Sequence, residues 1–211
     1  MHDKHWHTIV FIVSILLAGC AQPRVSLHPS MRSIDPDHYE KAFESWSREI
    51  SVLPFNGMDN VLTARATYRS HEFRRYFAAR VSSDLVSTPE EKAALEAKEL
   101  ESMNEGHEFY VTLMSAVLDC DELAPDEGPW TIRLKNDRGD EVAPALIEEV
   151  ENPLPQDAEY YRFDPKLRKA YRIRFPLKGD NGTPIIEKDT RYFELSFASA
   201  LGRDSARWEA R

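Results

Sequence analysis

The spacing of apolar residues predicts helices in the first half of the chain. Between residues 39 and 50 they recur at helical spacing behind Asp35 and Pro36, a pair typical of a helix start. A second helix is expected after Ser70, which can cap it. The segment from Ser87 to Asn104 opens with hydroxyl, proline and acidic residues, so a third helix should begin there. Its thin apolar face favours a position on the surface.

Alternation with a period of two predicts strands in the segment 60–69 and in most of the chain after residue 106. The later strands are expected at residues 107–117, 130–135, 141–150, 171–175, 184–188 and 192–197. Roughly seven strands at this spacing favour an immunoglobulin-like β-sandwich, with an N-terminal helix and a two-helix insertion at about residues 71–105. Another α+β fold is the alternative, because Trp130 has no cysteine pair on which to pack.

Trp130 provides a test of the sandwich. It precedes Ile132 and Leu134 on the same face of one strand, and the segment 193–197 offers the most apolar face elsewhere. Facing sheets lie about 10 Å apart and fill the gap with large side chains. We therefore expect Trp130 to be buried within reach of that segment. The alternative is an exposed binding aromatic at the mouth of a loop.

The N-terminal segment follows a different pattern. Residues 9–18 are apolar except for Ser14, and Leu17, Ala18, Gly19 and Cys20 close the run. A membrane-spanning helix needs roughly 20 apolar residues, which is about twice this length. A charged start, a short apolar core and small residues before a cut are typical of a secretory signal peptide. The segment resembles the lipobox of bacterial lipoproteins.

This resemblance implies that residues 1–19 are removed and that Cys20 becomes the lipid-bearing first residue. In that family an aspartate after the cysteine favours retention in the inner membrane, so Ala21 implies the periplasmic face of the outer membrane. Several acyl chains make such an anchor effectively permanent. Residues 20–35 are expected to form a lipidated tether that reaches at most about 50 Å, followed by a single β-rich domain at 36–211.

The chain is acidic, with 36 Asp and Glu against 27 Lys and Arg and a net charge of -9. Phosphate backbones and anionic membrane surfaces repel such a chain, so nucleic-acid binding is not expected and the acyl chains must provide the membrane contact. Because Cys20 is assigned to lipid, no second cysteine is left to form an internal disulfide with Cys120. We expect Cys120 to be a buried small residue, with an intermolecular bond as the alternative.

Two repeated tripeptides suggest a metal site. His71 and Glu72 precede one phenylalanine, and His107 and Glu108 precede another, each at a junction between helix and strand. Two histidines and two glutamates brought together would suit a divalent transition metal. Neither pair shows a metal-ligand spacing, however, so polar ends of elements are the favoured interpretation. We expect no cofactor.

Other polar clusters have ordinary structural interpretations. The acidic loop fails the calcium-loop spacing, although it contains Asp119, Asp121, Glu122, Asp126 and Glu127. The tripeptide 138–140 matches an integrin-binding sequence, but asparagine, aspartate and glycine are what a tight turn requires. The spaced arginines 203, 207 and 211 would align on a helical tail, which we expect to be frayed.

No arrangement of residues indicates an enzyme. The chain has no Gly-x-Ser-x-Gly elbow and no glycine-rich phosphate loop, and its acidic residues are too many for one pair to stand out. The favoured hypothesis is therefore a non-catalytic binding or structural module of the cell envelope, held at the outer membrane, with another envelope protein as its partner. A metal- or small-ligand-binding periplasmic protein is the alternative. A hydrolase of envelope polymers comes third.

Overall fold

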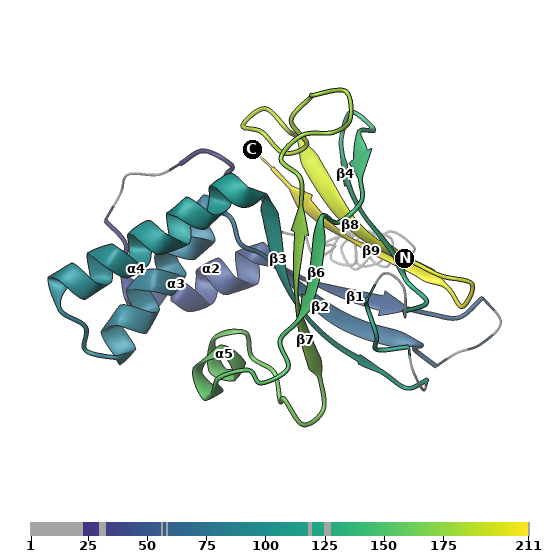
Figure 1. The fold of residues 1–211 in the computed structure, drawn as a ribbon, viewed down its shortest axis with the longest axis horizontal. Coiled ribbons are helices and arrows are strands. Elements are labelled where there is room, and N and C mark those ends of the chain that lie inside the picture. Colours follow the sequence, from purple (N-terminus) through teal and green to yellow (C-terminus); the bar gives the residue numbers. More distant parts are fainter. Residues whose placement is uncertain are drawn as a thin grey trace, which may run out of the picture.

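The computed structural model describes residues 23–29, 33–55, 57, 59–117, 120–124 and 128–210, so Cys20 and the lipobox lie outside the described residues. Within these ranges the chain is mainly β, and its strands form two antiparallel sheets that pack face to face. Helices cover the outer face of the first sheet (Figure 1). The molecule therefore has a helical layer, a first sheet and a second sheet.

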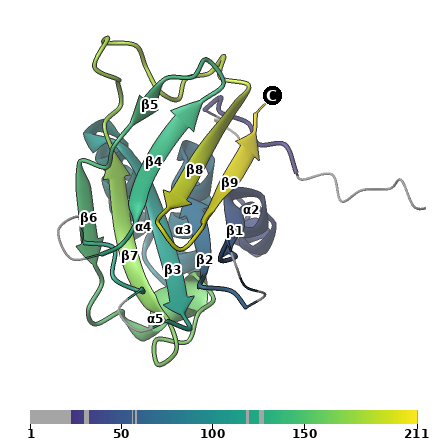
Figure 2. The same ribbon diagram turned by 90° about the vertical axis from the view of Figure 1, so that its right-hand side faces the viewer.

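The two sheets differ in the number of their strands and in strand order. The first has the order β1-β2-β3-β7-β6, with β1 at Ser47–Val52, β2 at Leu62–Tyr68, β3 at His107–Ser115, β7 at Lys169–Phe175 and β6 at Leu146–Glu149. The second has the order β5-β4-β8-β9, with β5 at Glu141–Val142, β4 at Thr131–Asn136, β8 at Tyr192–Ala198 and β9 at Arg203–Glu209. Figure 2 shows the two sheets with their strands running in similar directions, the aligned arrangement of a β-sandwich.

Aromatic side chains from both sheets fill the space between them. Phe109 on β3 lies 6.4 Å from Phe193 on β8 and 5.5 Å from Trp208 on β9, measured between ring centroids. Phe193 and Trp208 stack at 5.2 Å, and Tyr68 on β2 packs against Phe193 at 5.0 Å. Alternate residues of each strand point into this gap, which explains the period of two in the sequence.

Trp130 is buried, with 7% of its surface exposed, and its ring lies 6.5 Å from that of Phe197 on β8. Its Nε1 donates a hydrogen bond to the backbone carbonyl of Cys120. The prediction that Trp130 belongs to the core near the segment 193–197 is confirmed. The alternative of an exposed aromatic is wrong.

Helices occur mainly before and between the first strands. Their bounds are η1 Pro36–His38, α2 Tyr39–Trp46, α3 His71–Asp84, α4 Pro89–Glu101, η2 Ser102–Glu105 and α5 Pro155–Tyr160. Ser70 caps α3 through a hydrogen bond from Phe73, as expected. Thr88 and Glu91 form a capping box at the start of α4, with Pro89 in its first turn. Helices α3 and α4 pack against each other and connect β2 to its neighbour β3; we call this pair the helical arm.

Four expectations about elements are wrong. The segment 141–150 is not one strand, because β5 pairs in the second sheet and β6 pairs in the first. The first helix ends at Trp46, and Ile50 lies in β1, because the apolar positions after residue 46 fit strand alternation as well as helical spacing. The segment 184–188 forms a single bridge at Pro184 instead of a strand. The arginine-spaced tail is strand β9, in which Ala206 and Trp208 point inward. This tail forms a strand because it pairs with β8.

The segment expected to be a tether contacts the sandwich. Val25 is 2% exposed, and its backbone N–H donates to the carbonyl of Glu209 on β9. Arg48 on β1 also donates to the carbonyl of Pro23 and to that of Arg207. The chain is therefore held at the sandwich well before residue 36, where we expected the domain to begin.

Candidate functional site

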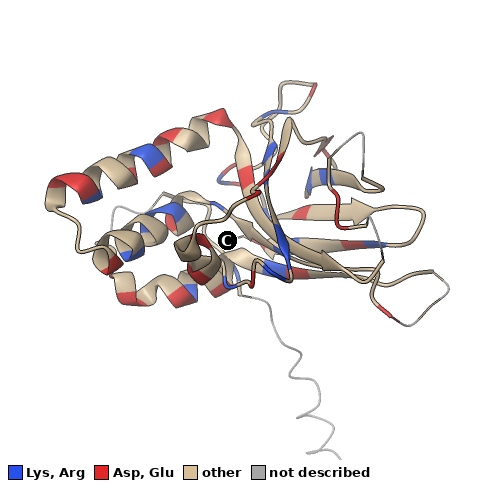
Figure 3. Ribbon diagram, turned by 60° about the horizontal axis from the view of Figure 1, so that its bottom comes forward, with Lys and Arg blue, Asp and Glu red and all other residues tan. Residues whose placement is uncertain are grey.

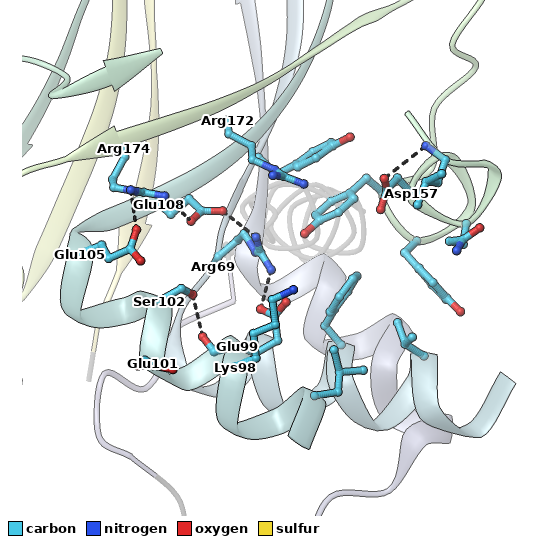
Figure 4. Close-up of a pocket in the computed structure, with 18 of the residues that line it drawn as sticks. Arg69, Lys98, Glu99, Glu101, Ser102, Glu105, Glu108, Asp157, Arg172 and Arg174 are labelled. Carbon is cyan, nitrogen blue, oxygen red and sulfur yellow. Dashed lines mark hydrogen bonds and ion pairs between the residues drawn. The ribbon is translucent and has the colours of Figure 1, made fainter. Parts of the chain in front are cut away.

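A cleft of about 730 Å³ lies on the outer face of the first sheet. Strands β3 and β7 form its floor, where Glu108 lies opposite Arg174 and Tyr110 lies opposite Arg172 in the antiparallel register. The helical arm forms one wall, and α5 forms the other. Figure 4 shows Arg172 and Arg174 reaching over the cleft from the sheet, with Glu99 and Lys98 on the arm across from them.

The chain at Gly106 fixes the distance between the arm and the sheet. Gly106 follows η2 directly, precedes β3 and has a φ of 152°. A Cβ atom at this position would lie 2.4 Å from the backbone carbonyl oxygen of Phe175 on β7. Only glycine permits so close an approach of the two backbones. The end of the arm is therefore held directly against the strand that supplies Arg172 and Arg174.

A buried ionic network joins the arm to the floor of the cleft. Arg69, between β2 and α3, contacts Glu99 on α4 at 2.5 Å and Glu108 on β3 at 2.6 Å. Arg74 on α3 contacts the same two carboxylates at 3.1 Å and 3.4 Å and donates to Ser102 at 2.7 Å. Arg74 is only 1% exposed, whereas the Arg69 side chain is 10% exposed where it lines the cleft. Both arginines connect the helices to the sheet. Such a network favours one arrangement of the arm, because removing any member leaves the remaining buried charges with fewer partners.

The network also determines the charge state of Glu108. Burial by itself would raise the pKa of this carboxyl, but Arg69 and Arg74 outweigh burial and hold the pKa below its usual value. Glu108 is therefore ionised at neutral pH and already accepts from two arginines. A carboxylate in this state is a weak proton acceptor, so it is poorly suited to act as a general base.

Tyrosine rings line the side of the cleft near α5. Tyr161, directly after α5, stacks on Tyr110 with ring centroids 3.7 Å apart and an angle of 8° between the planes. Phe77 on α3 packs against both Tyr160 and Tyr161. Burial raises the pKa of Tyr161 to about 12, so its hydroxyl is neutral at physiological pH. This side of the cleft presents flat apolar surface beside the charged floor.

Several hydrogen-bond donors of the cleft lack acceptors. Seven buried polar side-chain atoms in the described residues have no hydrogen-bond partner. Three of them belong to residues that line this cleft: the Tyr110 hydroxyl, Arg69 Nε and Arg174 Nε. The exposed Arg172 and Lys98 form no ion pair with any described residue. Buried polar groups usually have partners in native proteins, so a cluster of donors without them indicates a place for a bound acceptor.

The structure separates the four residues considered for a metal site. Glu108 belongs to the ionic network, and Glu72 accepts from the indole Nε1 of Trp46 at 2.9 Å. His71 and His107 do line one small cavity of about 170 Å³, where His107 Nδ1 pairs with the Tyr68 hydroxyl at 3.0 Å. Burial lowers the pKa of His107 to about 4, with the backbone of Leu177 opposing the shift. Within the described residues, no group of three or more His, Cys, Asp or Glu side chains is placed to hold a metal ion.

The remaining sequence candidates have structural roles where they can be seen. Lys169 pairs with Asp121 and Glu122 in the acidic loop, whereas Asp119, Asp126 and Glu127 lie outside the described residues. Cys120 is buried, as expected. In the turn at 138–140, the arginine and aspartate pair with each other at 3.2 Å. An ion pair within the turn stabilises its conformation.

Sequence reasoning missed most of the cleft. It identified Glu108, but not Arg69, Arg74, Tyr110 or Arg172. One signal was present: charged residues alternate with apolar ones in β7, and Glu108 precedes a run of apolar residues in β3. A strand with charges on its outer face, in a chain that also has helices to cover that face, indicates that something polar packs there. Which arginine would meet which glutamate depends on the register between distant segments.

Charge is mixed over this part of the molecule. Figure 3 shows acidic and basic positions interspersed along the helices and the neighbouring strands, without a large patch of either sign. None of the helices in the described ranges is long and apolar enough to cross a membrane. Comparisons with protein-family models, with curated proteins and with solved structures found no match for this chain. The cleft is thus interpreted from its own geometry.

Proposed function

We propose that the protein is a non-catalytic binding module of the bacterial cell envelope, anchored by lipid at Cys20 to the periplasmic face of the outer membrane. The observation that carries the binding role is the cleft, in which donors without acceptors lie beside aromatic walls. Largely preformed clefts of this size, with a few convergent polar groups, are typical ligand sites. The lipobox-like segment around Cys20 supports the location. The binding partner is another envelope component.

The sandwich itself is best interpreted as a variant of the immunoglobulin-like fold. Strands β2, β3, β7 and β6 follow the order A-B-E-D of that fold, and β5, β4, β8 and β9 follow the order C′-C-F-G. In this interpretation β1 is an additional strand at the edge, and the helical arm is an insertion between strands A and B. Trp130, directly before β4, then occupies the region of the buried tryptophan of strand C. The arm converts a common scaffold into one with a cleft.

The contact at Val25 limits how far the module can stand from the membrane. If Cys20 carries the acyl chains, the chain from Cys20 to Val25 can extend at most about 18 Å, compared with about 50 Å for a free tether that ends at residue 35. Val25 is buried and hydrogen-bonded to β9, so this limit depends on contacts within the sandwich. We therefore expect the module to remain close to the bilayer surface.

Photocrosslinking tests the binding role. Benzoylphenylalanine is placed at Leu154, which lines the cleft and is 56% exposed, and at the control position Leu167, which is 69% exposed and outside it. After irradiation of cells that express the chain, we expect a discrete adduct mass from position 154 alone. A Leu154→Trp variant with the photoprobe moved to Asn104 should lose that adduct. Equal labelling at both positions, or none at position 154, would contradict the proposal.

Replacement of one cysteine tests the anchor. Cys20→Ser should abolish lipid labelling and leave the chain unprocessed or released from membranes. Cys120→Ser is the matched control, since that buried residue lies within the sandwich and should leave labelling unchanged. A Cys20→Ser variant that still fractionates with outer membranes and has the mature mass would show that the lipobox interpretation is wrong.

A further inference from the structure

We infer that the cleft binds an organic oxyanion: Arg172 and Lys98 hold its carboxylate or phosphate group, and its apolar body lies against the rings near α5. This inference rests on the proposed binding role of the cleft and specifies the class of ligand. It follows from an excess of free hydrogen-bond donors over free acceptors in the lining.

The free hydrogen-bonding capacity of the cleft is mostly donor capacity. Arg172 on β7 and Lys98 on α4 face each other across the cleft, from the sheet and from the arm (Figure 4). Neither forms an ion pair with a described residue, although the lining of the cleft contains several glutamates. Guanidinium and ammonium groups placed on opposite sides bind an oxyanion well, because each donates charge-assisted hydrogen bonds.

The carboxylates of the cleft are mostly occupied already. Glu99 and Glu108 each accept from Arg69 and Arg74, and Glu105 pairs with Arg174 at 2.5 Å. Asp157 accepts from the backbone N–H of Leu154 at the start of α5. A cationic ligand would therefore compete with arginines for its acceptors. Glu101 has no ion pair in the described residues, but Figure 4 shows it across the arm from Arg172.

A buried hydroxyl gives an independent indication. Tyr110 is 2% exposed, lines the cleft beside Arg172 in the paired strand register, and its hydroxyl has no hydrogen-bond partner. Leaving a buried hydroxyl without a partner is unfavourable. A ligand oxygen close to Arg172 would remove that penalty. The donor that lacks a partner thus lies next to the cation that lacks one.

The apolar side of the cleft determines the rest of the ligand. Phe77, Val81, Leu95, Leu154 and Tyr160 line it together. Their surfaces would pack against a ring or a short hydrocarbon body, as the apolar walls of ligand sites commonly do. A free inorganic anion would leave these surfaces uncovered. We therefore expect affinity to require both an anionic head and an apolar body.

Calorimetry with the intact mature domain tests the inference with matched small probes. The anionic probes are 3-phenylpropionate and phenyl phosphate, which distinguish a carboxylate ligand from a phosphate ester. The uncharged and cationic counterparts are 3-phenylpropionamide and 3-phenylpropylamine. We expect at least one anion to bind at least tenfold more tightly than the amide and the amine. Binding should weaken as salt rises.

Substitutions assign the binding to the cleft. Arg172→Gln and Lys98→Gln should each lower the affinity for the anion at least tenfold. Thermal stability should stay unchanged because both residues are exposed. Arg203→Gln is the matched control, an exposed strand arginine in the second sheet that lies outside this cleft. Unchanged affinity in Arg172→Gln would overturn the inference.

Other outcomes also separate the two proposals. Amide or amine binding as tight as that of the anions, or no binding of either anion at millimolar concentration, overturns the oxyanion inference. The binding role of the cleft is decided independently by the photocrosslinked adduct from position 154. An adduct together with an anion that fails to bind means that the site is correct and the ligand class is wrong.

Discussion

The two faces of strand β3 have opposite chemistry. Phe109 points into the gap between the sheets, where it contacts aromatic rings of β8 and β9. Glu108 and Tyr110, its direct neighbours, point to the outer face. There Glu108 pairs with two arginines, and Tyr110 stacks on Tyr161 with its hydroxyl unsatisfied. The inner face stabilises the sandwich whether or not a ligand is present. The outer face fixes the position of an arm and leaves donors without partners, so we expect it to serve binding more than stability.

The largest loss of stability should come from removing a ring on the inner face. Phe109→Ala removes a fully buried ring that contacts both sheets, and such substitutions cost about 3–5 kcal/mol. Phe55→Ala is the matched control, because that ring is 67% exposed and should change the free energy of unfolding by less than about 0.5 kcal/mol. Urea unfolding followed by tryptophan fluorescence measures both. Equal costs would mean that the gap between the sheets is not the main core.

Neutralising a carboxylate on the outer face should lower the free energy of unfolding somewhat less. Glu108→Gln leaves Arg69 and Arg74 with one fewer carboxylate in a buried setting, and breaking such a pair costs about 3 kcal/mol. Glu101→Gln replaces an exposed carboxylate on the arm and should have no measurable effect on the free energy of unfolding. Amide exchange would show where the cost arises. If α3 and α4 keep their protection in Glu108→Gln, the network does not hold the arm.

The two faces should also lose stability in different pH ranges. His107 lies on the inner-face side of β3, and burial lowers its folded pKa to about 4 from an unfolded value near 6.5. The folded state therefore binds fewer protons than the unfolded state between these values, so stability is present above pH 6.5 and falls as the pH drops toward 4. The loss from pH 7 to pH 4.5 should be about 2 kcal/mol. For Glu108, whose folded pKa is lowered, stability is lost only at more acidic pH, as the carboxyl protonates.

Unfolding measured across pH tests this separation. His107→Gln keeps a polar partner for Tyr68 and should flatten the dependence between pH 7 and pH 4.5. Glu108→Gln should leave the slope in that range unchanged and reduce it below about pH 4.5. A slope that persists in His107→Gln would assign the titration to other groups.

Sequence patterns predicted the inner face much better than the outer one. Alternation identified Phe193, Leu195 and Phe197 as core residues because inward positions repeat within one strand. The ends of α3 and α4 were also readable, since Ser70 and Thr88 act within four residues of their partners. The arginines of the cleft were not, because Arg69 and Glu108 are 39 positions apart and meet only through the register of β2 with β3. Strand β9 was missed for the same reason: its inward residues are recognised only when β8 lies beside them.

The smallest effect on stability should come from the hydroxyl of Tyr110. Tyr110→Phe removes a buried group that has no partner and keeps the ring that stacks on Tyr161, so the free energy of unfolding should stay within about 0.5 kcal/mol of the parent or rise slightly. Tyr39→Phe is the matched control, because its buried hydroxyl donates to the carbonyl of Tyr160 at 2.7 Å and its loss should cost about 1 kcal/mol or more. Thermal and urea unfolding of the two variants give the comparison directly. If Tyr110→Phe destabilises as much as Tyr39→Phe, the Tyr110 hydroxyl already has an acceptor within the fold, and the outer face holds one donor fewer for a ligand.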